Sequence, residues 1–221
     1  MSVQTKNGRS VKAHIRYRNR NNKIIPGATT ITGILNKPAL VHWSWGLGME
    51  GIDYRAFRDD KAEIGTLVHS MVFNHLRNEE FDFSENTPKQ VELAKIAFDK
   101  FLDWEKGHKV KPILLETPLI SEEFQYGGTF DNYCKLDGIL TLLDYKTSKD
   151  IFPEMYYQLA AYSQLLIENG YRLERGQILR LGRNEEEGFD LSPIVKDFSL
   201  FFEVFKNCLN IYNLQKRIRA A

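Results

Sequence analysis

Residues 126–148 read YGGTFDNYCKLDGILTLLDYKTS, and this stretch decides the fold. The segments 123–134 and 139–146 show the alternation of side chains that is typical of strands. Asp137-Gly138 lies between them, and this dipeptide is common at the centre of tight hairpin turns. The stretch therefore predicts an antiparallel β-hairpin.

The register of this hairpin brings two aspartates together. If the Asp-Gly pair fills the two central positions of a type I′ turn, Leu136 pairs with Ile139 and Asp131 lies opposite Asp144. Two carboxylates about 5 Å apart repel by about 3 kcal/mol at an effective dielectric of roughly 20. A divalent cation between them removes this penalty, and oxygen ligands suit Mg²⁺ or Mn²⁺. The sequence therefore predicts a metal site, which a register shift of one residue would abolish.

A lysine completes this group of charges. Lys146 follows Asp144 by two residues, so both side chains lie on one face of the strand. Two carboxylates, a divalent cation and a lysine suit phosphodiester hydrolysis, because cationic groups stabilise the negative charge that develops on phosphorus-bound oxygens. The alternative interpretation is a surface hairpin that carries an Asp144–Lys146 salt bridge and no chemistry.

The composition is that of a soluble globular protein. Of the 221 residues, 43% are hydrophobic and 27% charged, which excludes a disordered or collagen-like chain. No apolar run approaches the ~18 residues of a membrane span, and the first residues lack a secretory signal pattern. The two cysteines are too few for a disulfide framework or an all-cysteine metal cluster. We therefore expect a cytoplasmic protein without a membrane partner.

The net charge of +1 is unevenly distributed. Residues 1–24 contain seven basic and no acidic residues, whereas the rest of the chain has 23 basic and 29 acidic residues. A basic arm on a mildly acidic body indicates a polyanionic partner. Val11, Ala13, Ile15 and Tyr17 alternate with basic side chains, so a solvated strand face is the alternative. An amphipathic strand satisfies both interpretations if its apolar face is buried and its basic face contacts phosphate.

The sequence predicts helices before and after the sheet. Strands at 112–120 and 176–182 are expected beside the hairpin, which gives a sheet of three or four strands. Thr87, Pro88 and Gln90 form the pattern of a helix start. The expected helices cover 29–36, a short segment from Pro38, about 61–77, 88–107, 152–170 and about 196–218, with Gly46, Gly48 and Gly51 loosening the chain before the third. We predict one α/β domain over 1–221, with a basic arm or hairpin at 1–25, a motif-bearing core at 26–170 and a C-terminal strand and helix at 171–221.

Five segments together resemble the PD-(D/E)XK nuclease superfamily, most closely its RecB-like branch and related phage and mitochondrial exonucleases. Two of them, GGTFD at 127–131 and LLDYKTS at 142–148, resemble the core motif of the superfamily. GTLVH at 65–69 is similar to the branch's upstream helix, which carries a metal-ligating histidine. QLAAY at 158–162 is similar to the Gln-x-x-x-Tyr motif of the branch, and residues 26–35 are similar to a segment common in phage members. The matches cover about 26–166. Phe130 departs from the proline of the superfamily's name, as in many RecB-like members.

The resemblance implies a restriction-endonuclease-like core with a central mixed β-sheet, and it implies roles for single residues. It implies His69, Asp131, Asp144 and the Tyr145 carbonyl as ligands of Mg²⁺ or Mn²⁺, with Lys146 positioning the attacking water. The other implied site residues are Gln158 and Tyr162, near the substrate strand or the lysine, and Glu116 as a further carboxylate. Nucleic-acid contacts are expected from Arg16, Arg18, Arg20, Thr147 and Ser148. Without the motif, His69 among its apolar neighbours would be interpreted as a core histidine.

We therefore predict a metal-dependent DNA nuclease, an exonuclease that acts in DNA recombination, repair or phage DNA processing. The expected partners are single- or double-stranded DNA and a single-strand annealing protein, in the host cytoplasm for a phage-encoded chain. The four cysteines that hold an iron–sulfur cluster in some relatives are missing, so no such cluster is expected. The alternatives are a nucleic-acid-binding module that no longer cuts, an endonuclease, and an RNA-acting phosphodiesterase. No motif indicates the oligomeric state.

Overall fold

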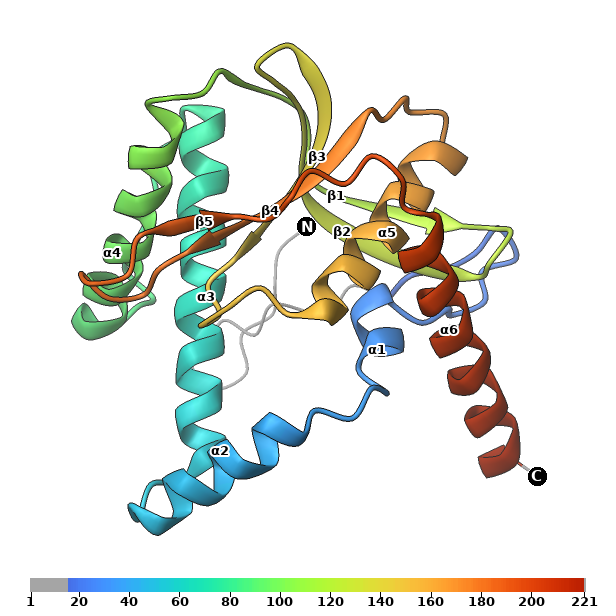
Figure 1. Cartoon of the computed structure of the whole chain (residues 1–221), viewed down its shortest axis with the longest axis horizontal. Helices are drawn as coiled ribbons and strands as arrows, with labels where there is room; N and C mark the ends of the chain where they lie inside the picture. Colours follow the sequence, from blue (N-terminus) through green and yellow to red (C-terminus); the bar gives the residue numbers. More distant parts are fainter. Residues whose placement is uncertain (1–15, 221) are drawn as a thin grey trace.

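The computed structural model describes residues 16–220, which form a five-stranded mixed sheet between helices (Figure 1). The strands follow one another across the sheet in chain order: β1 (Val110–Ser121), β2 (Tyr126–Leu136), β3 (Ile139–Lys146), β4 (Arg175–Leu181) and β5 (Phe189–Leu191). Neighbouring strands are antiparallel except β3 and β4, which are parallel. The prediction of a central mixed sheet flanked by helices is confirmed.

The sheet has one strand more than the largest number predicted. β5 has three residues, all of them exposed, and it follows the acidic loop after β4. A strand this short carries no alternation that could reveal it in the sequence. It is attached to β4 partly through side chains, because Arg180 Nε donates to Asp190 Oδ2 (2.6 Å). The prediction of three or four strands was therefore wrong, because it did not include this edge strand.

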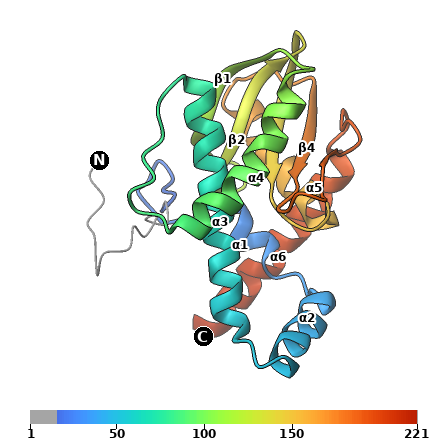
Figure 2. The ribbon, with the colours of Figure 1, turned by 90° about the vertical axis from the view of Figure 1, so that its left-hand side faces the viewer.

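Helices cover both faces of the sheet (Figures 1 and 2). α3 (Tyr54–Arg77) and α4 (Pro88–Glu105) pack on one face, and α1 (Ala28–Thr32), α5 (Pro153–Glu168) and α6 (Ser199–Ala220) pack on the other. β3 contributes to both cores, with Leu143 and Tyr145 facing α3 and α4, and Leu142 facing α5. No helix among residues 16–220 is both long and apolar enough to cross a bilayer.

Local sequence signals set the starts of α3 and α4. α3 begins well before the expected position near residue 61, because the Asp53 side chain caps it by accepting the N–H of Arg55 (2.8 Å). α4 begins where predicted, with a reciprocal capping box. The Gln90 N–H donates to Thr87 Oγ1 (3.3 Å), and the Thr87 N–H donates to Gln90 Oε1 (3.1 Å).

Two of the glycines expected to loosen the chain lie inside a helix. α2 (Pro38–Met49) continues through Gly46 and Gly48. Gly51, with a φ of +72°, is the one that adopts the left-handed conformation after the helix. A glycine costs a helix only about 1 kcal/mol relative to alanine, so the other residues of α2 outweigh both.

The hairpin has the predicted register. Its two turn residues both have positive φ, +54° and +88°, as a type I′ turn requires. Leu136 pairs with Ile139, and the pairing continues in this register as far as Asn132 and Leu143.

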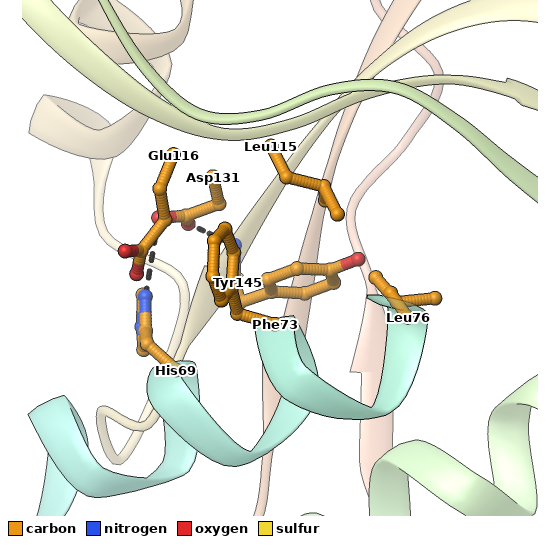
Figure 3. Close-up of a pocket in the computed structure, with 7 residues that line it drawn as sticks. All are labelled: His69, Phe73, Leu76, Leu115, Glu116, Asp131 and Tyr145. Atoms are coloured by element: carbon orange, nitrogen blue, oxygen red, sulfur yellow. Dashed lines mark hydrogen bonds and ion pairs between the residues drawn. The ribbon is translucent and has the colours of Figure 1, made fainter. Parts of the chain in front are cut away.

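The two aspartates do not form a regular pair at the next position. The ladder ends one residue before Asp131 and Asp144. Asp131 Oδ2 instead accepts the N–H of Tyr145 (2.7 Å), so a carboxylate takes the place of a backbone carbonyl. β2 and β3 part at this point, and the Asp131 side chain is directed at α3 (Figure 3). The predicted direct opposition of the aspartates is corrected accordingly.

Candidate active site

Four charged side chains from three elements gather where β2 and β3 part. His69 comes from α3, Asp131 from β2, and Asp144 and Lys146 from β3. His69 Nδ1 lies 3.1 Å from Asp131 Oδ1 (Figure 3), and Lys146 Nζ forms an ion pair with Asp144 Oδ2. The structure therefore brings together the charged residues that the sequence motifs singled out.

α3 presents His69 at the edge of its buried stripe. The stripe consists of apolar residues at helical spacing: Ile64, Leu67, Val68, Met71 and Val72. The His69 ring packs edge-on against the Tyr145 ring, with centroids 6.3 Å apart, and 23% of its side chain stays exposed. A histidine that is partly exposed beside a carboxylate differs from the fully buried core histidine that its neighbours alone would indicate.

A glycine lets α3 approach the end of β3. Gly65 precedes His69 by one helical turn, and a methyl group at Gly65 would lie 2.8 Å from Thr147 Oγ1. Atoms at that distance overlap, so with a larger residue there either the Thr147 side chain or the loop after Lys146 would have to shift. Gly65 therefore helps to hold His69 and Lys146 in one site.

Burial controls the ionisation of the Asp144–Lys146 pair. Desolvation raises the pKa of Asp144 to about 6, against the opposing effect of Lys146 and with a further contribution from Asp131. Burial by itself lowers the pKa of Lys146, but the Asp144 and Asp131 carboxylates outweigh it and raise this pKa. Among the described residues, Asp144 Oδ2 accepts no regular hydrogen bond, so the Lys146 ammonium is its partner.

The His69–Asp131 pair is stabilised in its charged form. Burial lowers the pKa of His69, but the Asp131 charge and hydrogen bond outweigh it and raise this pKa. Burial raises the pKa of Asp131, but His69, Lys146 and the Tyr145 N–H together lower it. A histidine must be neutral to bind a metal, so a proton and a metal ion would compete for His69.

The donors suit a hard divalent cation in their chemistry. Two carboxylates and a backbone carbonyl are oxygen ligands of the kind that Mg²⁺ and Mn²⁺ prefer, and the imidazole adds one nitrogen donor. Over residues 16–220, no three His, Cys, Asp or Glu side chains are arranged to hold one metal ion. The chemistry of the donor set fits the expected cation, while the side chains as placed form the two ion pairs described above.

Glu116 lines a small pocket at the same site. The other lining residues are His69, Phe73, Leu76, Leu115, Asp131 and Tyr145, and the Glu116 carboxylate points toward the His69 ring (Figure 3). Glu116 has a φ of +41°, which is unfavourable for a residue with a side chain. Such a conformation persists only where the surroundings enforce it. The structure therefore places this expected carboxylate beside the histidine.

α5 contributes the predicted glutamine and tyrosine as a bonded pair. Gln158 Nε2 donates to Tyr162 OH (2.5 Å). Burial, followed by the Asp144 charge, raises the pKa of Tyr162 well above its usual value, so the hydroxyl stays protonated. The Tyr162 ring lies against the backbone of Gly128, where a methyl group would come within 2.6 Å of Tyr162 Cε1. The second glycine of the GGTFD segment therefore makes room for this tyrosine.

The predicted nucleic-acid contacts of the arm are only partly described, because residues 1–15 lie outside the described range. Arg16, Arg18 and Arg20 are exposed. Arg18 pairs with Ile24 in a short bridge around the turn at Asn22, and Arg18 Nη1 donates to the Asn22 carbonyl (2.8 Å). The chain therefore turns at Asn22, and the three arginines at 16, 18 and 20 are exposed residues around this turn.

The two hydroxyl residues after Lys146 have local contacts. Thr147 lies against Gly65 of α3, and Ser148 Oγ donates to the Asp150 carbonyl (2.6 Å). Ser148 therefore shapes the loop that leads into α5, and its contact with phosphate stays a prediction.

One residue at the site was not among the predicted ones. The Tyr17 ring packs against Gly127 of β2. A methyl group added to Gly127 would come within 2.2 Å of Tyr17 Cγ. Its hydroxyl hydrogen-bonds to Thr129 Oγ1 (2.9 Å). The alternation of residues in the arm already placed Tyr17 on an apolar face. The glycine pair in β2 could have indicated that a ring packs against this strand.

Comparisons with known proteins give little further information. No protein-family model matches the chain, and no curated protein matches it significantly. The solved structure of SSO0001 aligns with a TM-score of 0.33 at 12% identity, over 57% of this chain and 62% of that one. An alkaline exonuclease, LHK-Exo from Laribacter hongkongensis, aligns with a TM-score of 0.33 at 14% identity, over 71% of this chain and 86% of that one.

These similarities are weak. The aligned part spans less than two thirds of the length of SSO0001. A TM-score of 0.33 is too low to establish a shared fold or activity, so the functional proposal rests on the motifs and on the site geometry.

Proposed function

We propose that this chain is a Mg²⁺- or Mn²⁺-dependent DNA nuclease of the PD-(D/E)XK type, and that it acts as an exonuclease. One observation carries the proposal: His69, Asp131, Asp144 and Lys146 meet where β2 and β3 part. Charged groups that are withdrawn from water cost free energy, and fold stability alone does not require them. Shifted pKa values of this kind are typical of functional sites.

Each charged group has a part in the proposed hydrolysis. Lys146 Nζ, held by Asp144, orients the attacking water and stabilises the negative charge that develops on the phosphoryl oxygens. The water oxygen forms a new bond to phosphorus and gives up one proton to the solvent, while the P–O3′ bond breaks and the released 3′ oxygen takes up one proton from the solvent. The products carry a 5′-phosphate and a 3′-hydroxyl. Gln158 and Tyr162 hold the substrate strand next to the lysine.

The expected metal site uses the same residues. His69, Asp131, Asp144 and the Tyr145 carbonyl would hold Mg²⁺ or Mn²⁺, with Glu116 as a further carboxylate beside them. When bound, the cation supplies Lewis-acid polarisation of the phosphoryl oxygen. The proposal includes no iron–sulfur cluster, because the chain has only two cysteines.

The proposed substrate is DNA, single- or double-stranded, and the exposed arginines of the arm supply long-range attraction for it. The motifs shared with phage exonucleases support a role in recombination, repair or phage DNA processing, in the host cytoplasm and beside a single-strand annealing protein. This assignment of pathway and partner rests on the family resemblance.

The test is cleavage of end-labelled linear DNA and closed-circular DNA with Mg²⁺, with Mn²⁺ or with excess chelator. We expect metal-dependent digestion of the linear form and no cutting of the circle. Lys146→Ala should lower the rate by ~100-fold or more, because the partly buried cation beside Asp144 that would stabilise the developing negative charge is lost. Lys135→Ala removes an exposed lysine near the hairpin turn and should leave the rate unchanged.

Other outcomes would change the proposal in defined ways. Cutting of the circle would reassign the site to an endonuclease. Preferential cutting of RNA would reassign it to an RNA phosphodiesterase. Salt-sensitive DNA binding without cleavage under any metal would contradict the enzyme and favour a binding module on a nuclease-like core.

A further inference from the structure

The Tyr17 ring packs against β2, the strand that carries Asp131. It lies on the same face of β2 as the Asp131 side chain. Residues of one strand alternate between faces, so Gly127, Thr129 and Asp131 share a face of β2. Tyr17 covers Gly127 and hydrogen-bonds to Thr129, while Asp131 contacts His69. The residues between them, Gly128 and Phe130, face Tyr162 on the other side of the strand. A continuous surface therefore runs from Tyr17 to the charged cluster.

Two glycines fix the position of the Tyr17 ring. A methyl group would lie 2.2 Å from Tyr17 Cγ if it were placed on Gly127, and 3.1 Å from Tyr17 Cε2 if it were placed on Gly27. The Gly127 N–H also donates to the Pro26 carbonyl (2.9 Å), which fastens this segment to β2. The ring thus rests on bare backbone, and its hydroxyl is held at Thr129.

The two hydroxyls form a pair at a defined distance from the site. Tyr17 OH and Thr129 Oγ1 are 2.9 Å apart, and both residues are partly exposed. Thr129 and Asp131 are two residues apart on a strand, or about 7 Å. Phosphates of one nucleic-acid strand follow one another at an axial rise of about 3.4 Å per nucleotide, so a strand that lies along β2 has a further phosphate within this distance. Side-chain hydroxyls are frequent donors to phosphate oxygens.

The charges around the hydroxyl pair favour an anion. Arg16 and Arg18 flank Tyr17 in sequence, and both are exposed. Arg20 is exposed as well, and its backbone N–H donates to Glu122 Oε1 (2.6 Å). Asp131 lies two residues beyond Thr129 on β2, and Asp144 lies on β3. These exposed cations are close to Tyr17 in sequence, and they attract a polyanion over long range without contacting the hydroxyl pair.

We propose that Tyr17 and Thr129 form a binding subsite for the backbone phosphate next to the one that is cleaved, with the arginines at 16 and 18 attracting the strand. This inference rests on the proposed nuclease function and adds a requirement to it: the substrate is a polynucleotide that spans two phosphates. Tyr17 contacts the substrate strand and has no part in bond breaking. Its loss should raise KM and weaken DNA binding more than it lowers kcat.

The experiment removes one partner on each side of the contact. Each linear DNA oligonucleotide carries one uncharged methylphosphonate, and the set places it in turn at each linkage near the end of the strand. Wild type, Tyr17→Phe and Thr129→Val are compared, with Tyr171→Phe as a matched control because its ring packs edge-on against Tyr133 in the core. Cleavage is measured with Mg²⁺, and the Kd is measured by fluorescence anisotropy in chelator.

We expect one methylphosphonate position to weaken wild-type binding about tenfold, since hydrogen bonds to a charged group are worth roughly that factor. Tyr17→Phe and Thr129→Val should weaken binding of unmodified DNA and be insensitive to that same position. Tyr171→Phe should behave as wild type.

Equal sensitivity of wild type and both variants at every position would overturn the subsite. The binding measurement gives this answer even if no DNA is cut, so the subsite and the nuclease proposal can fail separately. Thermal unfolding of each variant shows whether a loss of binding reflects a loss of fold.

Discussion

Substitution of Gly65 by alanine tests how α3 and the loop after Lys146 are held together. Alanine is favoured over glycine inside a helix by about 1 kcal/mol. The new methyl group would lie 2.8 Å from Thr147 Oγ1, and overpacking of this kind typically costs about 1–3 kcal/mol. Gly65→Ala should therefore leave the free energy of unfolding unchanged or lower it by up to about 2 kcal/mol. It should also lower the cleavage rate, because Lys146 immediately precedes the displaced residue.

The control is a double-mutant cycle with Thr147→Ala, which removes the oxygen that the methyl group meets. In that background Gly65→Ala should stabilise the protein by about 1 kcal/mol, the helix-propensity difference alone. Urea denaturation of the four proteins gives the coupling energy, expected at about 1–3 kcal/mol. A stabilisation of about 1 kcal/mol in both backgrounds would show that α3 and the loop do not meet at Gly65, and would refute the reasoning.

Three further predictions follow from single contacts. Gly128→Ala should lower the free energy of unfolding by about 1–3 kcal/mol in urea and slow cleavage, because its methyl group would come within 2.6 Å of the Tyr162 ring; unchanged stability would contradict this packing. Thr87→Ala should cost about 1 kcal/mol by removing the capping box of α4 and leave the cleavage rate intact, so a loss of activity at full stability would be unexpected. Burial raises the pKa of the Cys134 thiol to about 12, so a thiol reagent at pH 8 should label it only after unfolding, and labelling of the native protein would oppose this.

The parts of the fold that are set by local chemistry could be predicted from the sequence. The Asp-Gly turn fixes the hairpin register, because a type I′ turn pairs its flanking residues in one way only. The start of α4 is equally local, since Thr87 and Gln90 bond to each other. The three-residue strand β5 is held instead by a contact across the sheet, between Arg180 and Asp190, and has no pattern of its own.

The geometry of the site depends on contacts between residues distant in sequence, and the sequence predicted this geometry only approximately. The register predicted that Asp131 would lie opposite Asp144, but the ladder ends one position earlier. Asp131 is drawn to His69, which is 62 residues away, and accepts the Tyr145 N–H. Turn rules predict which backbone groups pair. They do not predict that a side-chain carboxylate replaces a backbone carbonyl as the acceptor of an N–H group. The packing of Tyr17 on β2 was not predicted for the same reason, because it depends on two glycines in separate segments.

The central claim is that the buried carboxylates serve metal-dependent cleavage of DNA. The most direct measurement is the initial rate of digestion of linear duplex DNA by wild type and Asp144→Asn, with Mg²⁺ and with excess chelator. We predict cleavage by wild type with Mg²⁺ only, and a loss of ~100-fold or more in Asp144→Asn, because the amide keeps the shape of the side chain and removes its charge. Undiminished cleavage by Asp144→Asn in excess chelator would contradict the account.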